Sequence, residues 1–587
     1  MKNLNEENLN EAQSKKLPSE EQKHLSYYDK DVYSAEIPNM SEYDFLLERN
    51  KNYMNDVAIT FAGKEITYEE LHTRIDEYAR ALYKKGVRQG DIVALGVANT
   101  PESIYLCYSL NKLGAITSPI NPTYNSYKIS RDLEIINPKM FIGINDCYKN
   151  FKNASDSMEI QMLVFPAVQS IDNKILHVMY GAKQLISGNL TLNPNKKLKR
   201  VIELGKNNKD VKYGNYTSGQ LSEIMFTGGS SGMHKGVDLD GNGLNAVVKS
   251  LDYVLCLKPG EKFLGNLPQF MAFGKMALHY ALCNNLNMEL TLKALPKDFV
   301  EELLRVHPQG VMGGPIHWET LIHSNLSKDD LKDLKMPISG GEQLKFEKEQ
   351  QINEALYNAG CSSTLWNGLG MSEMWAPVSV KRGNINSDKT IGTMIPFTNA
   401  KIIDINTGKE LDYGQVGMLH VTGPGMMIGY HNNPEETDKS IYVDDKDTRW
   451  FITGDLCKIE ENGELKYIGR LKRCFVCGCE NIYPEQIENM LSDLPEVREA
   501  IVTKIPDDKL QFLPKYHISL YDENCDTQQL EKKIEKIIMS TLGEAALPKF
   551  YEYHTEPFPR TPNAKIDPKP LQEQDLNKIK AKTLMKQ

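Results

Sequence analysis

The sequence predicts an α/β protein built from several lobes. Its 587 residues exceed the usual size of one domain, which is roughly 100–200 residues. Helix-like and strand-like apolar patterns alternate over residues 66–122, as in a parallel sheet covered by helices. Beyond Ala400, short apolar runs broken by glycine, asparagine and proline indicate a small β-rich lobe, and a compact mixed module follows Arg470.

Composition narrows the class of protein. Hydrophobic residues make up 40% and charged residues 25%, which is ordinary globular usage. The 69 basic and 78 acidic residues give a net charge of -9, which argues against a nucleic-acid or anionic-membrane partner. The N-terminus lacks the apolar core of a signal peptide, and ten cysteines in so long a chain favour reduced thiols. We expect a cytoplasmic enzyme that acts as a monomer or homodimer, with no nucleic-acid or membrane partner.

The alternating elements follow one another in a clear order. Thr67 is the expected N-cap of a helix that ends at Gly86. Its expected apolar face consists of Leu71, Ile75, Tyr78, Ala79 and Leu82. Lysine- and asparagine-rich residues 146–215 give no sign of chemistry, and the next α/β stretch runs over residues 222–399. The remaining expected elements are a strand at 92–97, a helix at 101–113 and a strand at 115–120.

Three regions are expected along the chain. Residues 1–40 form a polar arm, either poorly ordered or loosely docked. Residues 41–471 form a large N-terminal domain and residues 472–587 a small C-terminal one. The boundary is placed near Lys472, where a charged, helix-poor connection separates two differently patterned regions.

The segment Met225–Val237 is the most informative. Glycines allow backbone N–H groups to close on phosphate oxygens, hydroxyl groups add donors, and a lysine adds positive charge. The residues concerned are Thr227, Gly228, Gly229, Ser230, Ser231, Gly232 and Lys235. The spacing does not fit the Walker pattern, so a phosphate loop and an ordinary glycine-rich turn both remain open.

A hydrolase interpretation uses the same segment. Gly228–Gly232 fits the G-x-S-x-G nucleophile elbow, with Ser230 as the nucleophile. That elbow needs a helix directly after it, and the residues that follow are poor helix formers.

Four further segments carry polar groups suited to a nucleotide. Asp455 follows a tight turn and can accept hydrogen bonds from two ribose hydroxyls, Arg470 supplies a guanidinium and Lys565 an ammonium. The segments, in order, are Asn367–Glu373, Trp450–Leu456, Gly469–Lys472 and Pro559–Asp567.

Together with the glycine-rich segment, this set resembles the adenylate-forming, acyl-activating superfamily. The superfamily includes the acyl- and aryl-CoA synthetases, firefly luciferase and the adenylation domains of peptide synthetases. The resemblance extends from about Glu65 to Leu571. It implies a large N-terminal domain of αβαβα-type subdomains with a small β-rich subdomain, followed by a small, mobile α+β C-terminal domain.

The resemblance implies a role for each motif. The Thr227–Lys235 segment would bind the ATP phosphates, and Ser372 would touch the α-phosphate. Glu373 would ligate Mg²⁺, and Lys565 would bridge the substrate carboxylate and the α-phosphate. Asp455 and Arg470 would bind the ribose, and Lys472 would be the hinge. Residues implied around the nucleotide base are Gly341, Glu342, Gln343, Asn367, Gly368, Leu369, Gly370 and Met371. Residues suggested for the acyl pocket are Met271, Phe273, Gly314, Trp318 and Trp375.

The implied reaction is an ATP-dependent ligation of a carboxylic acid to a thiol through an acyl-adenylate. The cofactors would be ATP, Mg²⁺ and coenzyme A. Met271 stands where relatives often have a histidine, and no carboxylate nearby could hold a substrate ammonium, so a non-amino acid is expected. Leu369 replaces the usual adenine-stacking tyrosine, and Gly241 replaces a frequent histidine.

Two positions that bear on the acceptor depart from the family pattern, because Val476 and Gly478 stand where CoA-using relatives often have lysines. A phosphopantetheinyl carrier protein therefore remains an alternative acceptor, and an inactive nucleotide-binding regulator is a third interpretation. A zinc site is a further alternative, because Cys474, Cys477 and Cys479 have C-x-x-C-x-C spacing that Cys457 or another ligand could complete.

Overall fold

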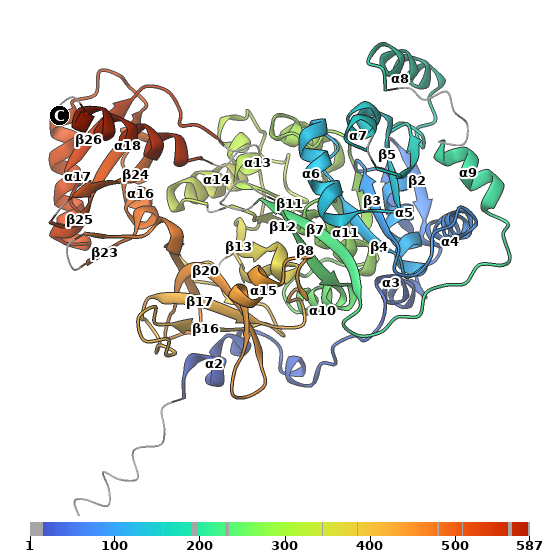
Figure 1. Cartoon of the computed structure of the whole chain (residues 1–587), viewed down its shortest axis with the longest axis horizontal. Helices are drawn as coiled ribbons and strands as arrows, with labels where there is room; N and C mark the ends of the chain where they lie inside the picture. The colour runs from blue at the N-terminus through green and yellow to red at the C-terminus, as the bar shows by residue number, and fades with distance from the viewer. Residues whose placement is uncertain are drawn as a thin grey trace, which may run out of the picture.

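A computed structural model describes residues 16–155, 158–189, 197–228, 234–342, 344–383, 385–477, 480–507, 509–560 and 566–584. The chain forms a large body with three sheets and a smaller C-terminal domain at one side, drawn in orange-red in Figure 1. This α/β arrangement confirms the predicted fold class.

A nine-stranded sheet with the order β15-β14-β13-β12-β11-β9-β10-β1-β2 forms one wall of the large body. Its central strands are parallel, whereas β2 at one edge and β14 and β15 at the other are antiparallel. Its strands are β1 (Val57–Phe61), β2 (Lys64–Thr67), β9 (Lys262–Gly265), β10 (Asn287–Leu290), β11 (Gly310–Gly313), β12 (Met336–Ser339), β13 (Trp366–Met371), β14 (Ala376–Lys381) and β15 (Thr393–Met394).

A seven-stranded sheet with the order β18-β8-β7-β4-β3-β5-β6 forms the second wall. It too is parallel at its centre, with an antiparallel edge made by β8 and β18. Its strands are β3 (Ile92–Gly96), β4 (Ile116–Pro119), β5 (Met140–Ile144), β6 (Gln161–Phe165), β7 (Leu221–Gly228), β8 (His234–Asp240) and β18 (Gly429–Tyr430).

Helices lie between and around these two sheets. The inner helices α3 (Glu42–Asn50), α5 (Pro101–Lys112), α10 (Gly241–Leu251) and α11 (Ala272–Cys283) contact one another and the strands. Every residue of α11 except Phe273 is buried, as expected for a helix covered on all sides. The other helices of the large body are α4 (Tyr68–Lys84), α6 (Ser126–Ile136), α7 (Tyr148–Ser155), α8 (Lys174–Ile186), α9 (Leu198–Gly205), α12 (Phe299–Val306), α13 (Pro315–Trp318), α14 (Phe346–Asn358) and α15 (Pro434–Ser440).

Helix α4 shows how the local sequence signals work. The Thr67 side chain accepts a hydrogen bond from the Glu70 backbone N–H and so caps the first turn. The five apolar side chains predicted to share one face are all buried: Leu71, Ile75, Tyr78, Ala79 and Leu82. The predicted helix is therefore confirmed.

The β-rich lobe contains β16 (Asn399–Ile403), β17 (Gly417–Thr422), β19 (Ile441–Val443), β20 (Arg449–Ile459) and β21 (Leu465–Arg470). The N-terminal segment 16–34, called the strap below, packs against this lobe and the neighbouring edge of the nine-stranded sheet. It contains α2 (Pro18–Glu21), and its Tyr28 hydroxyl donates to the Met394 carbonyl at 2.7 Å. Residues 16–34 of the predicted arm are therefore docked on the large body.

The C-terminal domain has its own hydrophobic core, whose first member is Phe475. Helices cover a five-stranded sheet in which β25 is central. Its elements are β22 (Phe475–Cys477), β23 (Glu480–Ile482), α16 (Pro484–Ser492), β24 (Val497–Asp507), β25 (Gln511–Leu520), α17 (Thr527–Thr541), β26 (Phe550–His554) and α18 (Lys569–Leu584). None of the helices among the described residues is both long and apolar enough to cross a membrane.

Candidate active site

The glycine-rich segment is the tip of a β-hairpin. Strands β7 and β8 are antiparallel, and their register pairs Thr227 with Lys235. A strand therefore follows the glycines where a nucleophile elbow needs a helix, so the hydrolase interpretation is wrong. Gly228 ends β7, and the predicted loop residues Gly229, Ser230, Ser231 and Gly232 lie outside the described residues.

Lys235 forms an ion pair with Glu436 in the first turn of α15. Its ammonium also lies 4.9 Å from the centre of the Tyr430 ring, and the Tyr430 hydroxyl donates to Glu373 Oε1 at 3.0 Å. Burial and the Glu373 carboxylate together raise the pKa of Tyr430 well above its usual value. Tyr430 thus contacts both Lys235 of the hairpin and Glu373, the predicted magnesium ligand.

Ser372 and Glu373 lie in a short 3-10 helix, η7 (Ser372–Met374), directly after β13. The next two residues, Trp375 and Ala376, have positive φ angles of 54° and 85°. Two consecutive non-glycine residues in this region are costly, so the surrounding structure must hold the turn in place.

The glycines of Asn367–Met371 allow β14 to approach β13 closely. A Cβ atom on Gly368 would lie 2.4 Å from the Ser379 carbonyl oxygen, and one on Gly370 would lie 2.8 Å from that of Ala376. Asn367 is buried, whereas Leu369 and Met371 are half-buried. The segment predicted to contact adenine therefore runs along a strand that ends at Ser372.

Asp455 and Arg470 face each other across β20 and β21. Arg470 Nε lies 2.8 Å from Asp455 Oδ1, and its Nη1 donates to the Thr453 carbonyl at 3.1 Å. Asp455 is only 1% exposed, while the Arg470 side chain is 53% exposed. Burial alone would lower the pKa of Arg470, but Asp455, Tyr467 and Glu373 raise it. Glu373 is therefore near enough to link this pair electrostatically to the Tyr430 cluster.

The predicted base-binding turn follows β12. Gly341 has a φ of 88°, and the Gly340 N–H donates to the Gly313 carbonyl at 3.0 Å. Phe273 packs on this turn, since a Cβ atom on Gly340 would lie 3.2 Å from its ring. A Cβ atom on Gly314 would lie 3.8 Å from the Gly340 carbonyl oxygen. Glu342 is half-buried, and Gln343 lies outside the described residues.

The structure separates the other residues suggested for the acyl pocket. Trp318 is fully buried, packs against Phe299 and donates to the Ile338 carbonyl at 3.0 Å. Trp375 is also fully buried and donates to the Asp240 carbonyl at 2.8 Å, beside α10. Met271, at the start of α11, is 41% exposed. Phe273 and Gly314 meet at the Gly340 turn, while both tryptophans belong to the packed interior.

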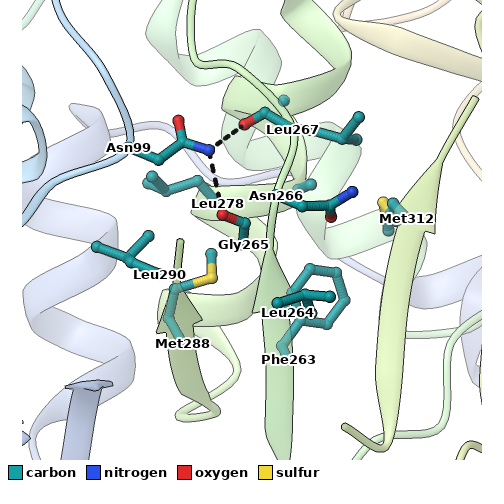
Figure 2. Close-up of a pocket in the computed structure, with 12 residues that line it drawn as sticks. Asn99, Phe263, Leu264, Gly265, Asn266, Leu267, Leu278, Met288, Leu290 and Met312 are labelled. Atoms are coloured by element: carbon teal, nitrogen blue, oxygen red, sulfur yellow. Dashed lines mark hydrogen bonds between the residues drawn. The ribbon is translucent and has the colours of Figure 1, made fainter. Parts of the chain in front are cut away.

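A small cavity lies beside the Asn266–Leu267 segment (Figure 2). Its volume is about 10 Å³, which is about the space of one water molecule. Met288 and Met312 contribute flexible thioether side chains to its wall, and Asn99 Nδ2 closes one side by donating to the Gly265 and Leu267 carbonyls. The cavity therefore has pliable apolar walls, and Gly274, the residue after Phe273 in α11, also lines it.

The connection to the C-terminal domain runs through η8 (Leu471–Arg473), which contains the predicted hinge Lys472. Glu485, from α16, accepts a hydrogen bond from the Arg470 N–H at 2.9 Å and pairs with Arg473. The predicted catalytic Lys565 lies outside the described residues.

The cysteine alternative gains no support from the residues that can be described. Cys457 belongs to the core of the large body and Cys477 to the core of the C-terminal domain. Cys474 contacts the Arg470 carbonyl, and Cys479 lies outside the described residues. The three described thiols do not gather into a metal-binding group.

Sequence reasoning missed two groups at this site. Tyr430 and Glu436 were not singled out, although Asn433 as N-cap and Pro434 at the first position are a helix-start signal that locates α15.

The second missed group is a buried ion triad in which Lys275 lies 3.0 Å from both Glu42 and Glu223. Glu223 is in β7, which leads into the hairpin, so the triad fixes this strand to α3 and α11. A Cβ atom on Gly241 would lie 2.9 Å from Glu42, so Glu42 uses the space that this glycine leaves open.

Comparison with known proteins points to one family. The family model described as "AMP-binding enzyme" matches residues 46–431. The chain is 25% identical to a long-chain-fatty-acid–CoA ligase of Bacillus subtilis, with 92% of this chain and 96% of that protein covered. It is 26% identical to a probable 4-coumarate–CoA ligase 3 of Dictyostelium discoideum, with 82% and 87% covered. Its fold resembles apo MatB of Rhodopseudomonas palustris, with a TM-score of 0.72, 21% identity and 91% and 99% covered.

Proposed function

The chain belongs to the AMP-binding enzyme family, and on that premise we propose that it is an AMP-forming ligase that joins a non-amino carboxylic acid to coenzyme A. One observation carries the proposal. Five residues from separate segments form one electrostatically linked cluster: Lys235, Tyr430, Glu373, Arg470 and Asp455. Such a cluster offers cationic groups for phosphates and a buried carboxylate for ribose hydroxyls.

In the first half-reaction, a substrate carboxylate oxygen attacks the α-phosphorus of ATP. The bond from that phosphorus to the oxygen bridging to the β-phosphate breaks, and pyrophosphate leaves. Lys235 would exchange Glu436 for a phosphate oxygen, and Lys565 would bring the two anionic reactants together. In the second half-reaction, a thiol sulfur attacks the acyl carbon, AMP leaves and the thiol proton is released. We propose that the C-terminal domain turns about Lys472 between the two steps.

Glu373 is the proposed ligand for Mg²⁺. A carboxylate oxygen suits this hard cation, and Tyr430 holds one oxygen of the side chain by donating to it. Bound there, the ion would neutralise charge on the phosphates. The fit of Mg²⁺ to this site rests on the chemistry of the ligands. The protein supplies a single carboxylate, and the phosphates of the substrate would complete the site.

Apolar features favour an acid with a hydrophobic tail. Phe273 packs at the Gly340 turn, and the next residue, Gly274, lines the small cavity, whose methionine walls could rearrange around an acyl group. The relatives named above are ligases of long-chain fatty acids and of 4-coumarate, so both aliphatic and aromatic acids belong in a substrate panel.

Coenzyme A is the proposed acceptor because the curated relatives are named as CoA ligases. A carrier-protein phosphopantetheine is the alternative, favoured by the uncharged Val476 on β22. Saturation of the second half-reaction by free CoA would support coenzyme A as the acceptor. Acylation of a carrier protein without use of CoA would support the carrier protein.

The test of adenylation is exchange of labelled pyrophosphate into ATP that depends on an added carboxylic acid. Absence of exchange across a broad acid panel, with ATP binding retained, would support the regulator interpretation instead. Lys565→Ala should abolish the exchange but leave thiolysis of a supplied acyl-adenylate largely intact. Equal loss of both steps would contradict the role proposed for Lys565.

A further inference from the structure

Helix α8 presents its apolar face to solvent. Five large aliphatic side chains on this 13-residue helix are strongly exposed: Ile175 (73%), Val178 (72%), Met179 (64%), Leu185 (65%) and Ile186 (88%). At 3.6 residues per turn, these positions and Ala182 fall within an arc of about 120° on one side of the helix. A helix that packs on a globular core places such a stripe inward, so the orientation here is reversed.

The opposite side of α8 is polar and holds the helix on the body. Gln184 Nε2 donates to Asp146 Oδ1 at 2.9 Å, and the Tyr180 hydroxyl donates to the other oxygen of the same carboxylate. His177 Nε2 lies 2.8 Å from the Ile171 carbonyl. Because these bonds fix the rotation of the helix, the aliphatic stripe cannot turn inward without breaking them.

Basic side chains border the stripe. On the helical projection, Lys174 falls beside one edge of the arc and Lys183 beside the other, and both are exposed. Lys183 Nζ also lies 3.9 Å from Asp146 Oδ1, in an ion pair that leaves the lysine side chain 74% exposed. The surrounding described residues between 146 and 205 contain seven basic residues (Lys149, Lys152, Lys174, Lys183, Lys197, Lys199 and Arg200) and four acidic ones (Asp146, Glu159, Asp172 and Glu203). This local excess of three positive charges contrasts with the net charge of -9 of the chain.

The shape of the region favours a lipid surface over a second protein. Figure 1 shows α8 at the outer edge of the large body, as a single projecting helix. A helix of 13 residues is about 20 Å long and about 10 Å wide, far less than the roughly 800 Å² per partner of a stable protein interface. A bilayer needs no matching groove, because an apolar stripe bordered by lysines can enter the boundary between acyl chains and anionic headgroups.

We propose that α8 docks the protein on an anionic lipid surface, lying in the plane of the membrane without crossing it. The aliphatic stripe would supply the apolar contact, and Lys174 and Lys183 would pair with headgroup phosphates. The whole-chain charge predicted no membrane partner, but docking depends on the charge near the contact, which has the opposite sign. The proposal is independent of the acid and acceptor proposed above.

Sedimentation of the full chain with lipid vesicles tests the proposal. We expect binding to phosphatidylcholine vesicles that contain phosphatidylglycerol and weaker binding to phosphatidylcholine alone. The double variant Val178→Gln/Ile186→Gln removes apolar area without changing charge and should weaken partitioning by roughly tenfold or more. Lys174→Gln/Lys183→Gln should reduce the preference for the anionic vesicles. A matched control, Tyr357→Gln/Met539→Gln, changes two exposed apolar residues on α14 and α17 and should bind like the wild type.

Three results would overturn the proposal. Wild-type protein that stays in the supernatant with both vesicles does not dock on lipid. Equal binding by the α8 variant and the control places the contact elsewhere. A lipid-free dimer that Val178→Gln/Ile186→Gln converts to monomer, as measured by light scattering, assigns the stripe to a second copy instead. Circular dichroism of each variant verifies that the fold is intact.

Discussion

The ion pair between Lys235 and Glu436 makes a specific prediction about ATP binding. If Lys235 binds a phosphate, it must first leave Glu436, so the pair competes with the nucleotide. We therefore predict that Glu436→Gln lowers the KM for ATP. The kcat of acid-dependent pyrophosphate exchange should change little, because Glu436 is not assigned to the reacting atoms.

The size of the effect follows from the exposure of the pair. The Lys235 and Glu436 side chains are 25% and 31% exposed, so the pair is neither buried nor fully solvated. The Lys235 hydrogen bond holds the pKa of Glu436 below its usual value, so the carboxylate is ionised at neutral pH. Partly exposed pairs contribute up to about 1 kcal/mol, which corresponds to a decrease in KM of up to about fivefold.

The assay is pyrophosphate exchange at varied ATP concentration, with Glu435→Gln as the control. Glu435 is next to Glu436 on α15 but pairs with Lys439, and both side chains are largely exposed. Its variant changes the net charge equally without freeing Lys235, so its KM should stay near that of the wild type. An unchanged or higher KM in Glu436→Gln, or an equal decrease in both variants, would refute the competition.

Three other predictions concern strand spacing, a buried charge and the strap. Gly368→Ala should lower both exchange activity and melting temperature, since its Cβ would lie 2.4 Å from a backbone oxygen of β14; wild-type values in both assays would contradict this close approach. Lys275→Met should lower the unfolding free energy, measured in denaturant, by about 3–5 kcal/mol, because it leaves the buried Glu42 and Glu223 without their cation. Adding Glu42→Gln and Glu223→Gln to this variant should recover much of the lost stability. Burial lowers the pKa of His24 to about 4, so between about pH 6.5 and pH 4 the released strap binds a proton and the docked strap does not. The contribution of His24 to docking is therefore fully present above this window. At pH 5 docking should be weaker by about 2 kcal/mol, which is a roughly thirtyfold change in the opening equilibrium. Hydrogen exchange of residues 16–34 that is equally slow at pH 7 and pH 5, after correction for the intrinsic rate, would contradict the His24 prediction.

Local signals in the sequence predicted much of the fold. Helix α4 was predicted because its cap and apolar spacing are contained within about twenty residues, and the shift to short strands after Ala400 was equally local. The candidate nucleotide residues were chosen from motifs that are short and occur in a recognisable order, and their roles stay predictions.

Contacts between distant segments could not be predicted in this way. Glu42 and Lys275 are separated by more than two hundred residues, and no periodicity links a glutamate in one helix to a lysine in another. The same holds for Lys235 and Glu436, which meet because β18 pairs with β8 and brings α15 to the hairpin. The sequence does show the apolar spacing of α8, but only the bonds of Tyr180 and Gln184 to Asp146 fix which side faces solvent.

The hydrogen bond from the Arg470 N–H to Glu485 gives the two domains a shared residue. The side chain of Arg470 pairs with Asp455 in the large body, while its backbone binds the first helix of the C-terminal domain. A Cβ atom on Gly469 would lie 2.4 Å from Glu485 Oε2, so a larger residue there would displace the Glu485 carboxylate from this position. If the domain turns as proposed, ligand occupancy and domain position are thermodynamically linked. A nucleotide that shifts Arg470 changes the equilibrium between domain orientations, and any partner that fixes the orientation must change nucleotide affinity by the same factor.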